Sequence, residues 1–153
     1  MSLYRGHLVG GLISYIIVTV LASVFQNGLV FSIPGLIATL AGSLFPDIDV
    51  RSNGQNLFLK VLFLMIVLCL FLQASVPLIL LLIFSVLPLI FPHRGLFHDL
   101  YFIVALVALF SGAMIYSMPS SWRTIVTIAF FFMVGVLSHL VLDKGMKKTF
   151  QHD

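Results

Sequence analysis

Residues 124–142 read TIVTIAFFFMVGVLSHLVL, and Asp143 follows them directly. An apolar run of this length can cross a hydrocarbon core about 30 Å thick. Comparable runs recur along the chain, in which 61% of the residues are hydrophobic and 8% are charged. Because helices inside lipid must pack on one another to satisfy their few polar groups, the sequence predicts an all-α polytopic membrane bundle.

Six apolar segments are expected to be helices, and they cover residues 8–25, 31–45, 57–72, 76–91, 100–118 and 124–142. The polar stretch 51–56 is interpreted as an exposed loop between the second and third helices. The second segment, with about 15 residues, is marginal for a crossing, so a tilted, interfacial or re-entrant segment stays open. The whole chain, 1–153, is expected to be a single transmembrane domain.

Six crossings would bring the N-terminus, residues 46–56, residues 92–99 and the C-terminal tail to one face of the membrane. Most of the cations would gather at that face, while Arg123 alone would lie opposite, next to Trp122 as an interfacial anchor. The gathered cations are Arg5, Arg51, Lys60, Arg94, Lys144, Lys147 and Lys148. Since positive charge collects on the cytoplasmic side, both termini are predicted to be cytoplasmic, in a cell inner membrane.

Several classes of site are excluded by composition. The net charge of +3 comes from scattered Lys and Arg that form no stripe, so nucleic-acid binding is not expected. Cys69 is the only cysteine and lies within an apolar run, which excludes an intrachain disulfide and a cluster of thiolate ligands. Cys69 is therefore interpreted as a buried structural residue.

The candidate site consists of imidazoles and carboxylates at the ends of the apolar runs. Ionisable groups at membrane depth are costly unless they pair, line a cavity or bind a cation. His139 and Asp143 are four residues apart and so lie on one face of a helix, where they can bind one ion or two adjacent ions. The predicted metal ligands are His7, Asp47, Asp49, His93, His98, His139 and Asp143, whereas His152 is left out of the site.

These ligand types favour a divalent cation, with Zn²⁺ first and Mn²⁺ or Fe²⁺ as alternatives. Seven ligands exceed the three or four of one catalytic zinc, so either two ions share a carboxylate or one ion is bound and the spare groups act around it. The metal would lower the pKa of a bound water toward neutrality. Asp49 or Asp99 would then accept the proton, and Arg94 would hold a phosphate oxygen.

Each residue also has a simpler interpretation. His7 taken alone would be a surface or packing residue, and Asp99 would be only the N-cap of the fifth helix. Asp47 would cap a loop, and Arg94 would follow the positive-inside bias. His139 and Asp143 would form an intramembrane hydrogen-bonded pair without a metal. These alternatives stay open at the level of sequence.

Four stretches carry a resemblance to a known family: His7-Leu-Val-Gly-Gly11, Gly42-Ser-Leu-Phe-Pro-Asp-Ile-Asp49, His93-Arg-Gly-Leu-Phe-His98 and Gly135-Val-Leu-Ser-His139-Leu-Val-Leu-Asp143. In this order they are spread along the chain nearly from end to end. With them the chain resembles the bacterial inner-membrane family described as metal-dependent hydrolases and as LexA-regulated or LexA-binding membrane proteins. The resemblance implies a helical membrane protein with a divalent-metal site at the same seven residues. A more distant likeness to zinc-dependent phospholipase C implies phosphoester chemistry on a lipid.

The favoured function is a membrane-embedded, metal-dependent hydrolase whose substrate is a phospholipid or another amphiphilic phosphoester entering from the inner leaflet. The alternative is a non-enzymatic membrane protein with a structural or sensory metal, acting as a regulatory or partner-binding module. Transport is less favoured, because a transporter places polar groups near the bilayer midplane and these helix centres are nearly free of them.

Overall fold

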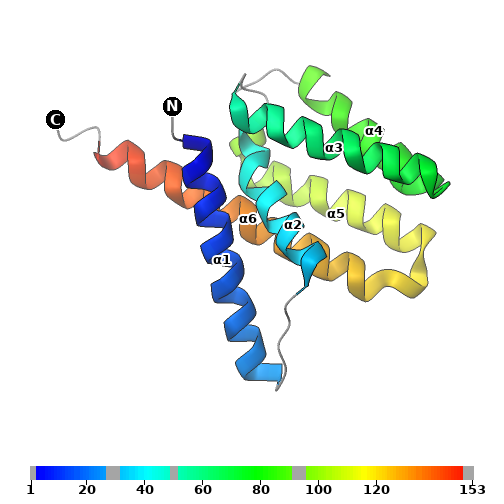
Figure 1. Cartoon of the computed structure of the whole chain (residues 1–153), viewed down its shortest axis with the longest axis horizontal. Coiled ribbons are helices and arrows are strands. Elements are labelled where there is room, and N and C mark those ends of the chain that lie inside the picture. The colour runs from blue at the N-terminus through cyan, green and yellow to red at the C-terminus, as the bar shows by residue number, and fades with distance from the viewer. Residues whose placement is uncertain (1–2, 27–31, 49–51, 91–95, 150–153) are drawn as a thin grey trace. The chain divides into compact units, whose positions relative to one another are not determined.

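The structure is a computed structural model that describes residues 3–26, 32–48, 52–90 and 96–149, and all regular structure within them is helical. Six α-helices are labelled in Figure 1. In chain order, the elements are α1 Leu3–Gln26, α2 Ile33–Leu44, η1 Phe45–Asp47, α3 Asn53–Phe71, α4 Ser75–Ile90, η2 Leu96–His98, α5 Leu100–Ser117, η3 Pro119–Ser121 and α6 Trp122–Thr149. The three η elements are single 3₁₀ turns. The all-helical class and the six helices are as predicted.

The chain forms two compact units. Unit 1 comprises Met1–Pro46 and Thr127–Asp153, and unit 2 comprises Asp47–Val126. Unit 1 therefore contains α1, α2 and most of α6, whereas unit 2 contains α3, α4 and α5. That the chain is a single transmembrane domain stays a prediction.

Four helical stretches are long and apolar enough to cross a membrane: Tyr4–Val24, Asn53–Phe71, Leu100–Ser117 and Pro119–Lys144. The apolar part of α4, Ser75–Val86, is shorter. With 12 residues, α2 is about 18 Å long, against a hydrocarbon core of about 30 Å. The second helix is thus short, as expected. Six crossings stay a prediction, and so does the gathering of both termini, residues 46–56 and residues 92–99 at one face of the membrane.

Three helix boundaries differ from those predicted by four or more residues. α1 begins at Leu3, because nothing in residues 3–7 opposes helix formation strongly, and His7 therefore lies inside the helix. α3 begins at Asn53, within the stretch interpreted as a loop, because the Ser52 side chain accepts a hydrogen bond from the Gln55 N–H at 3.0 Å and caps the helix. α6 continues to Thr149, since no proline follows Asp143 to stop it.

Glycines set the packing of unit 1. A Cβ added at Gly42 of α2 would overlap the carbonyl oxygen of Phe132, and one added at Gly135 of α6 would overlap the carbonyl oxygen of Thr39. At Gly11 of α1, an added Cβ would lie 2.9 Å from the Ser43 side chain. The backbones of α2 and α6 are therefore in direct contact, as small residues permit between membrane helices.

A buried tyrosine fixes α1 against the start of α2. The Tyr15 hydroxyl donates to the Ser32 carbonyl at 2.7 Å and accepts from the Ser32 N–H at 2.8 Å. The Tyr15 ring packs on Phe131 of α6, with ring centroids 5.1 Å apart, and Ala38 completes this core cluster. Because the backbone of Ser32 satisfies the Tyr15 hydroxyl, this group can be buried without an unpaired donor or acceptor.

Unit 2 is a set of three helices joined by aromatic contacts. α3 turns back into α4 through Gln73, which has a φ of 53°, and the Ala74 N–H closes the turn by donating to the Cys69 carbonyl at 2.9 Å. Phe84 of α4 contacts Phe58 of α3 at 6.2 Å between centroids and Phe110 of α5 at 5.4 Å. Figure 1 shows these helices side by side. Cys69 is buried, in agreement with a structural role.

The glycine contacts predict an asymmetry between two similar substitutions. Gly42→Ala should lower the free energy of unfolding in detergent by about 1–3 kcal/mol, because the new methyl group overlaps a backbone carbonyl that cannot move alone. Gly6→Ala should be neutral or stabilising, because a Cβ at Gly6 meets nothing within 4 Å and alanine is the better helix former. Thermal unfolding followed by circular dichroism measures both, and equal stability of the two variants would contradict the contact.

Candidate metal centre

The first ligand comes from the start of α1. His7 lies one turn into this helix and is 2% exposed. The sequence placed His7 ahead of the helix and offered a surface or packing position as the simpler interpretation. The surface interpretation is wrong, since α1 begins four residues earlier and turns the imidazole into the interior of unit 1.

Two further ligands come from α6. His139 is fully buried, and its Nε2 lies 3.6 Å from Oδ2 of Asp143 on the next turn. The Asp143 side chain keeps 25% of its surface accessible. The spacing of four residues thus places both groups on one helix face, as predicted from the sequence.

α1 and α6 bring these three side chains together. The rings of His7 and His139 are stacked, with centroids 3.9 Å apart and an interplanar angle of 19°. Nε2 of His7 also lies 3.4 Å from Oδ1 of Asp143. A neutral imidazole can act as a metal ligand, so the two rings and the Asp143 carboxylate offer three ligand groups in one place.

A backbone carbonyl from α2 orients the second imidazole. Nδ1 of His139 lies 2.8 Å from the carbonyl oxygen of Ser43. Because a carbonyl oxygen only accepts hydrogen bonds, Nδ1 must carry the proton, and the lone pair of a neutral ring is then on Nε2. Nε2 is the atom nearest Asp143. Histidines that bind metals are commonly fixed in this way by a hydrogen bond from the other ring nitrogen.

The three groups are close enough together to hold a cation. Their ligand atoms all lie within 4.8 Å of one another. Two ligand atoms that bind a tetrahedral zinc at about 2.0–2.1 Å lie about 3.4 Å from each other. The separations between Asp143 and the Nε2 atoms of His7 and His139, 3.4 and 3.6 Å, are closer to this value than to the length of a strong hydrogen bond. Two imidazoles and one carboxylate form a three-ligand set of the kind that leaves a fourth position for water or substrate.

A second pair of predicted ligands meets in unit 2. Nε2 of His98, in η2, lies 3.7 Å from Oδ1 of Asp47, and each side chain is 29% exposed. The turn after Asp47 is held to the start of α3, because the Gln55 side-chain amide donates to the Ile48 carbonyl at 2.7 Å. That all seven predicted ligands form one centre, with one or two ions, stays a prediction.

The remaining predicted site residues divide in two. Asp49, His93 and Arg94 lie outside the described residues. Asp99 is the N-cap of α5, where its Oδ1 accepts a hydrogen bond from the Phe102 N–H at 3.0 Å. The capping interpretation of Asp99 is therefore confirmed, while its role as a proton acceptor stays a prediction.

Sequence reasoning missed the role of Ser43. The carbonyl group that orients His139 belongs to the backbone, and side-chain chemistry gives no signal for such a group. The available signal was indirect: Gly42 precedes Ser43, and Gly135 lies one turn before His139. Glycines at these positions indicate that two backbones approach each other next to the ligand.

The comparisons with known proteins identify the family. A family model described as YdjM inner membrane protein matches residues 1–151. The chain belongs to the YdjM inner membrane protein family. It is accordingly an inner membrane protein with several apolar helices. No curated protein and no solved structure matches it. The hydrolase activity and the connection with LexA that the sequence resemblance implied stay predictions.

The centre predicts which carboxylate a metal needs. Asp143→Asn should weaken Zn²⁺ binding by about 100-fold or more, because it removes the negative charge between the two imidazoles. Asp99→Asn makes the same chemical change at a helix cap, where asparagine serves as well as aspartate, and should leave zinc affinity unchanged. Competition with a chromophoric chelator gives both affinities, and equal loss in the two variants would argue against this ligand set.

Proposed function

We propose that this protein is a metal-dependent hydrolase embedded in the inner membrane. Its substrate is a phospholipid or another amphiphilic phosphoester, which reaches the site from the cytoplasmic leaflet. The observation that carries the proposal is the cluster of His7, His139 and Asp143, in which two stacked imidazoles lie beside one carboxylate.

The exposure of Asp143 supports access to this cluster. The two imidazoles are buried, whereas a quarter of the Asp143 side chain is accessible. A substrate would therefore approach the ion from the Asp143 side. A divalent ion bound there supplies Lewis-acid chemistry, which makes water a competent nucleophile at neutral pH. The chain's own groups hold the ion, with the Ser43 carbonyl keeping the His139 ring in place.

Other residues are assigned supporting roles. Asp49 or Asp99 accepts the proton of the attacking water, and Arg94 binds a phosphate oxygen through a charge-assisted hydrogen bond. His98 and Asp47 are close enough to bind a cation together, which is compatible with a second ion. Lipid is the substrate class favoured by the surroundings, since many large apolar side chains on α1 and α6 are exposed.

One observation favours a non-enzymatic function as the second candidate. His7 and His139 are almost completely buried and closely packed between three helices, as in metal sites that stabilise a fold or respond to metal supply. In that case the ion would hold α1 to α6, and its coordination shell would be closed. Removing the metal would then lower the stability of the fold, and the protein would have no catalytic activity with or without the metal.

Activity assays on the zinc-loaded protein in detergent test the proposal. Release of phosphate ester from a short-chain phospholipid and from bis(p-nitrophenyl) phosphate should be measurable, and His139→Ala should abolish it together with zinc binding. His152→Ala, a matched histidine substitution outside the predicted site, should retain both. Absence of hydrolysis across Zn²⁺, Mn²⁺ and Fe²⁺, combined with stoichiometric metal in the parent protein, would support the structural or sensory alternative instead.

A further inference from the structure

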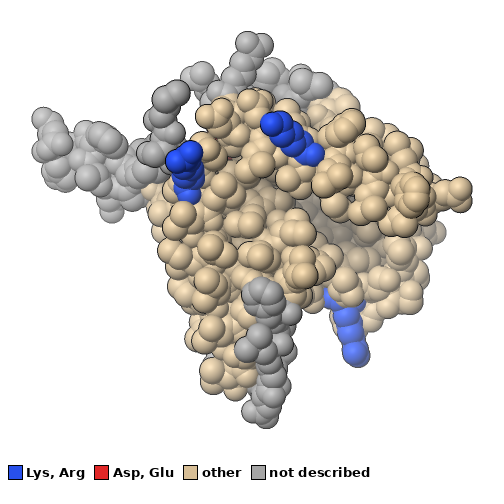
Figure 2. All heavy atoms as spheres, in the orientation of Figure 1, with Lys and Arg blue, Asp and Glu red and all other residues tan. Residues whose placement is uncertain are grey.

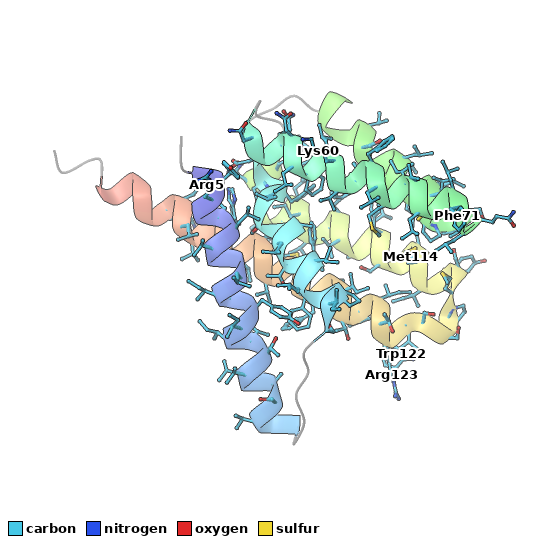
Figure 3. All side chains as sticks on the ribbon, in the orientation of Figure 1. Arg5, Lys60, Phe71, Met114, Trp122 and Arg123 are labelled. Atoms are coloured by element: carbon cyan, nitrogen blue, oxygen red, sulfur yellow. The ribbon has the colours of Figure 1, made fainter. Side chains whose placement is uncertain are left out.

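A single cation interrupts the apolar surface of α3. Lys60 is the only charged residue in this helix, which is otherwise long and apolar enough to cross a membrane. The side chain is exposed, and Figure 3 labels it on α3 toward the end opposite Phe71. A charged group inside a spanning helix is costly unless it reaches the interface or meets an opposite charge.

No carboxylate of the surrounding helices is available to Lys60. Residues 52–90, which include α3 and α4, contain no Asp and no Glu. The two described aspartates of unit 2 have other roles, since Asp47 lies against His98 and Asp99 caps α5. On the face in Figure 2, Lys and Arg side chains stand out among residues of other types, and no Asp or Glu is visible among the described residues. Within the described part of unit 2, an anion that pairs with Lys60 would have to come from another molecule.

Lys60 belongs to a hollow with an amphiphilic lining. The hollow has a volume of about 410 Å³ and is lined by Asn56, Lys60, Leu59 and Phe63. Asn56 and Lys60 are one turn apart, as are Leu59 and Phe63, so a polar row and an apolar row lie side by side on the helix. Asn56 lies one turn before Lys60, and both side chains line the same hollow.

The level of the hollow in unit 2 fits the membrane surface. Lys60 is seven residues from the start of α3, or about 10 Å along the axis, a depth from which a lysine side chain can reach the interface. The exposed Tyr101 stands near the start of α5, at the same end of the three-helix set as the start of α3. Tyr116 and Trp122 are exposed at the other end. Such aromatic residues commonly mark the two interfaces.

We infer that the Asn56–Lys60 hollow binds the headgroup of an anionic phospholipid. The Lys60 ammonium pairs with the phosphate, the Asn56 amide donates a second hydrogen bond, and the acyl chains lie along Leu59 and Phe63. The described residues that line this site all belong to α3, none of them is a candidate metal ligand, and the site does not depend on hydrolase activity. It gives unit 2 a preference for negatively charged lipid at one membrane surface.

Lipid binding to the purified full chain tests this inference. Native mass spectrometry in a neutral detergent should show that phosphatidylglycerol is retained about fivefold more than phosphatidylethanolamine with the same acyl chains, the factor that corresponds to about 1 kcal/mol per lysine near a charged surface. Lys60→Gln should abolish this preference, while Lys60→Arg should keep it. Arg123→Gln, a matched loss of one cation outside the hollow, should leave it unchanged.

Three outcomes would overturn the inference: equal retention of the two lipids by the parent protein, an unchanged preference in Lys60→Gln, or displacement of phosphatidylglycerol by millimolar inorganic phosphate. The last would mean that the hollow recognises phosphate without a lipid. Zinc content, measured on the same Lys60→Gln sample, should equal that of the parent. Zinc content thus reports on the metal centre, and lipid retention reports separately on the hollow.

Discussion

The direct backbone contact between α2 and α6 is the constraint on which the candidate centre depends. Gly42 and Gly135 leave no room for a side chain at this contact. The short distance between the helices is what brings the Ser43 carbonyl within 2.8 Å of Nδ1 of His139. That hydrogen bond fixes the ring, and the next turn of α6 supplies Asp143. A bulkier residue at either glycine would separate α2 from α6 and break the hydrogen bond that orients the His139 ring. The packing of these two helices therefore determines the geometry of the candidate centre.

The electrostatics of unit 1 favour a cation at the cluster of His7, His139 and Asp143. Two imidazoles in stacking contact and one carboxylate lie together in an apolar protein, where an uncompensated charge costs several kcal/mol. A divalent ion shared by the three groups would compensate the carboxylate and would use the lone pair of each neutral ring. The glycine contacts and the buried Tyr15 hydroxyl hold the scaffold in the required arrangement. The proposed lipid site is independent of this centre and depends on Lys60, the single charged residue of α3.

Much of this arrangement could be predicted from the sequence, and the failures have physical causes. Hydropathy located all six helices, and the spacing of His139 and Asp143 placed them on one face, because helix periodicity is local information. The start of α1 was missed because a helix can begin without a strong capping signal, so His7 was not recognised as buried. The partner of His139 could not be found, since a backbone carbonyl brought close by tertiary packing has no signature in residue types. Whether all seven ligands meet depends on long-range packing, which local patterns do not encode.

The central claim is that α1 and α6 hold one cation between two imidazoles and a carboxylate. An anomalous-difference map of a crystal of the zinc-loaded protein, recorded at the zinc absorption edge, tests this most directly. The account predicts a peak about 2.0–2.2 Å from Nε2 of His7, Nε2 of His139 and a carboxylate oxygen of Asp143. A structure with ordered side chains at these positions and anomalous density only elsewhere would contradict it.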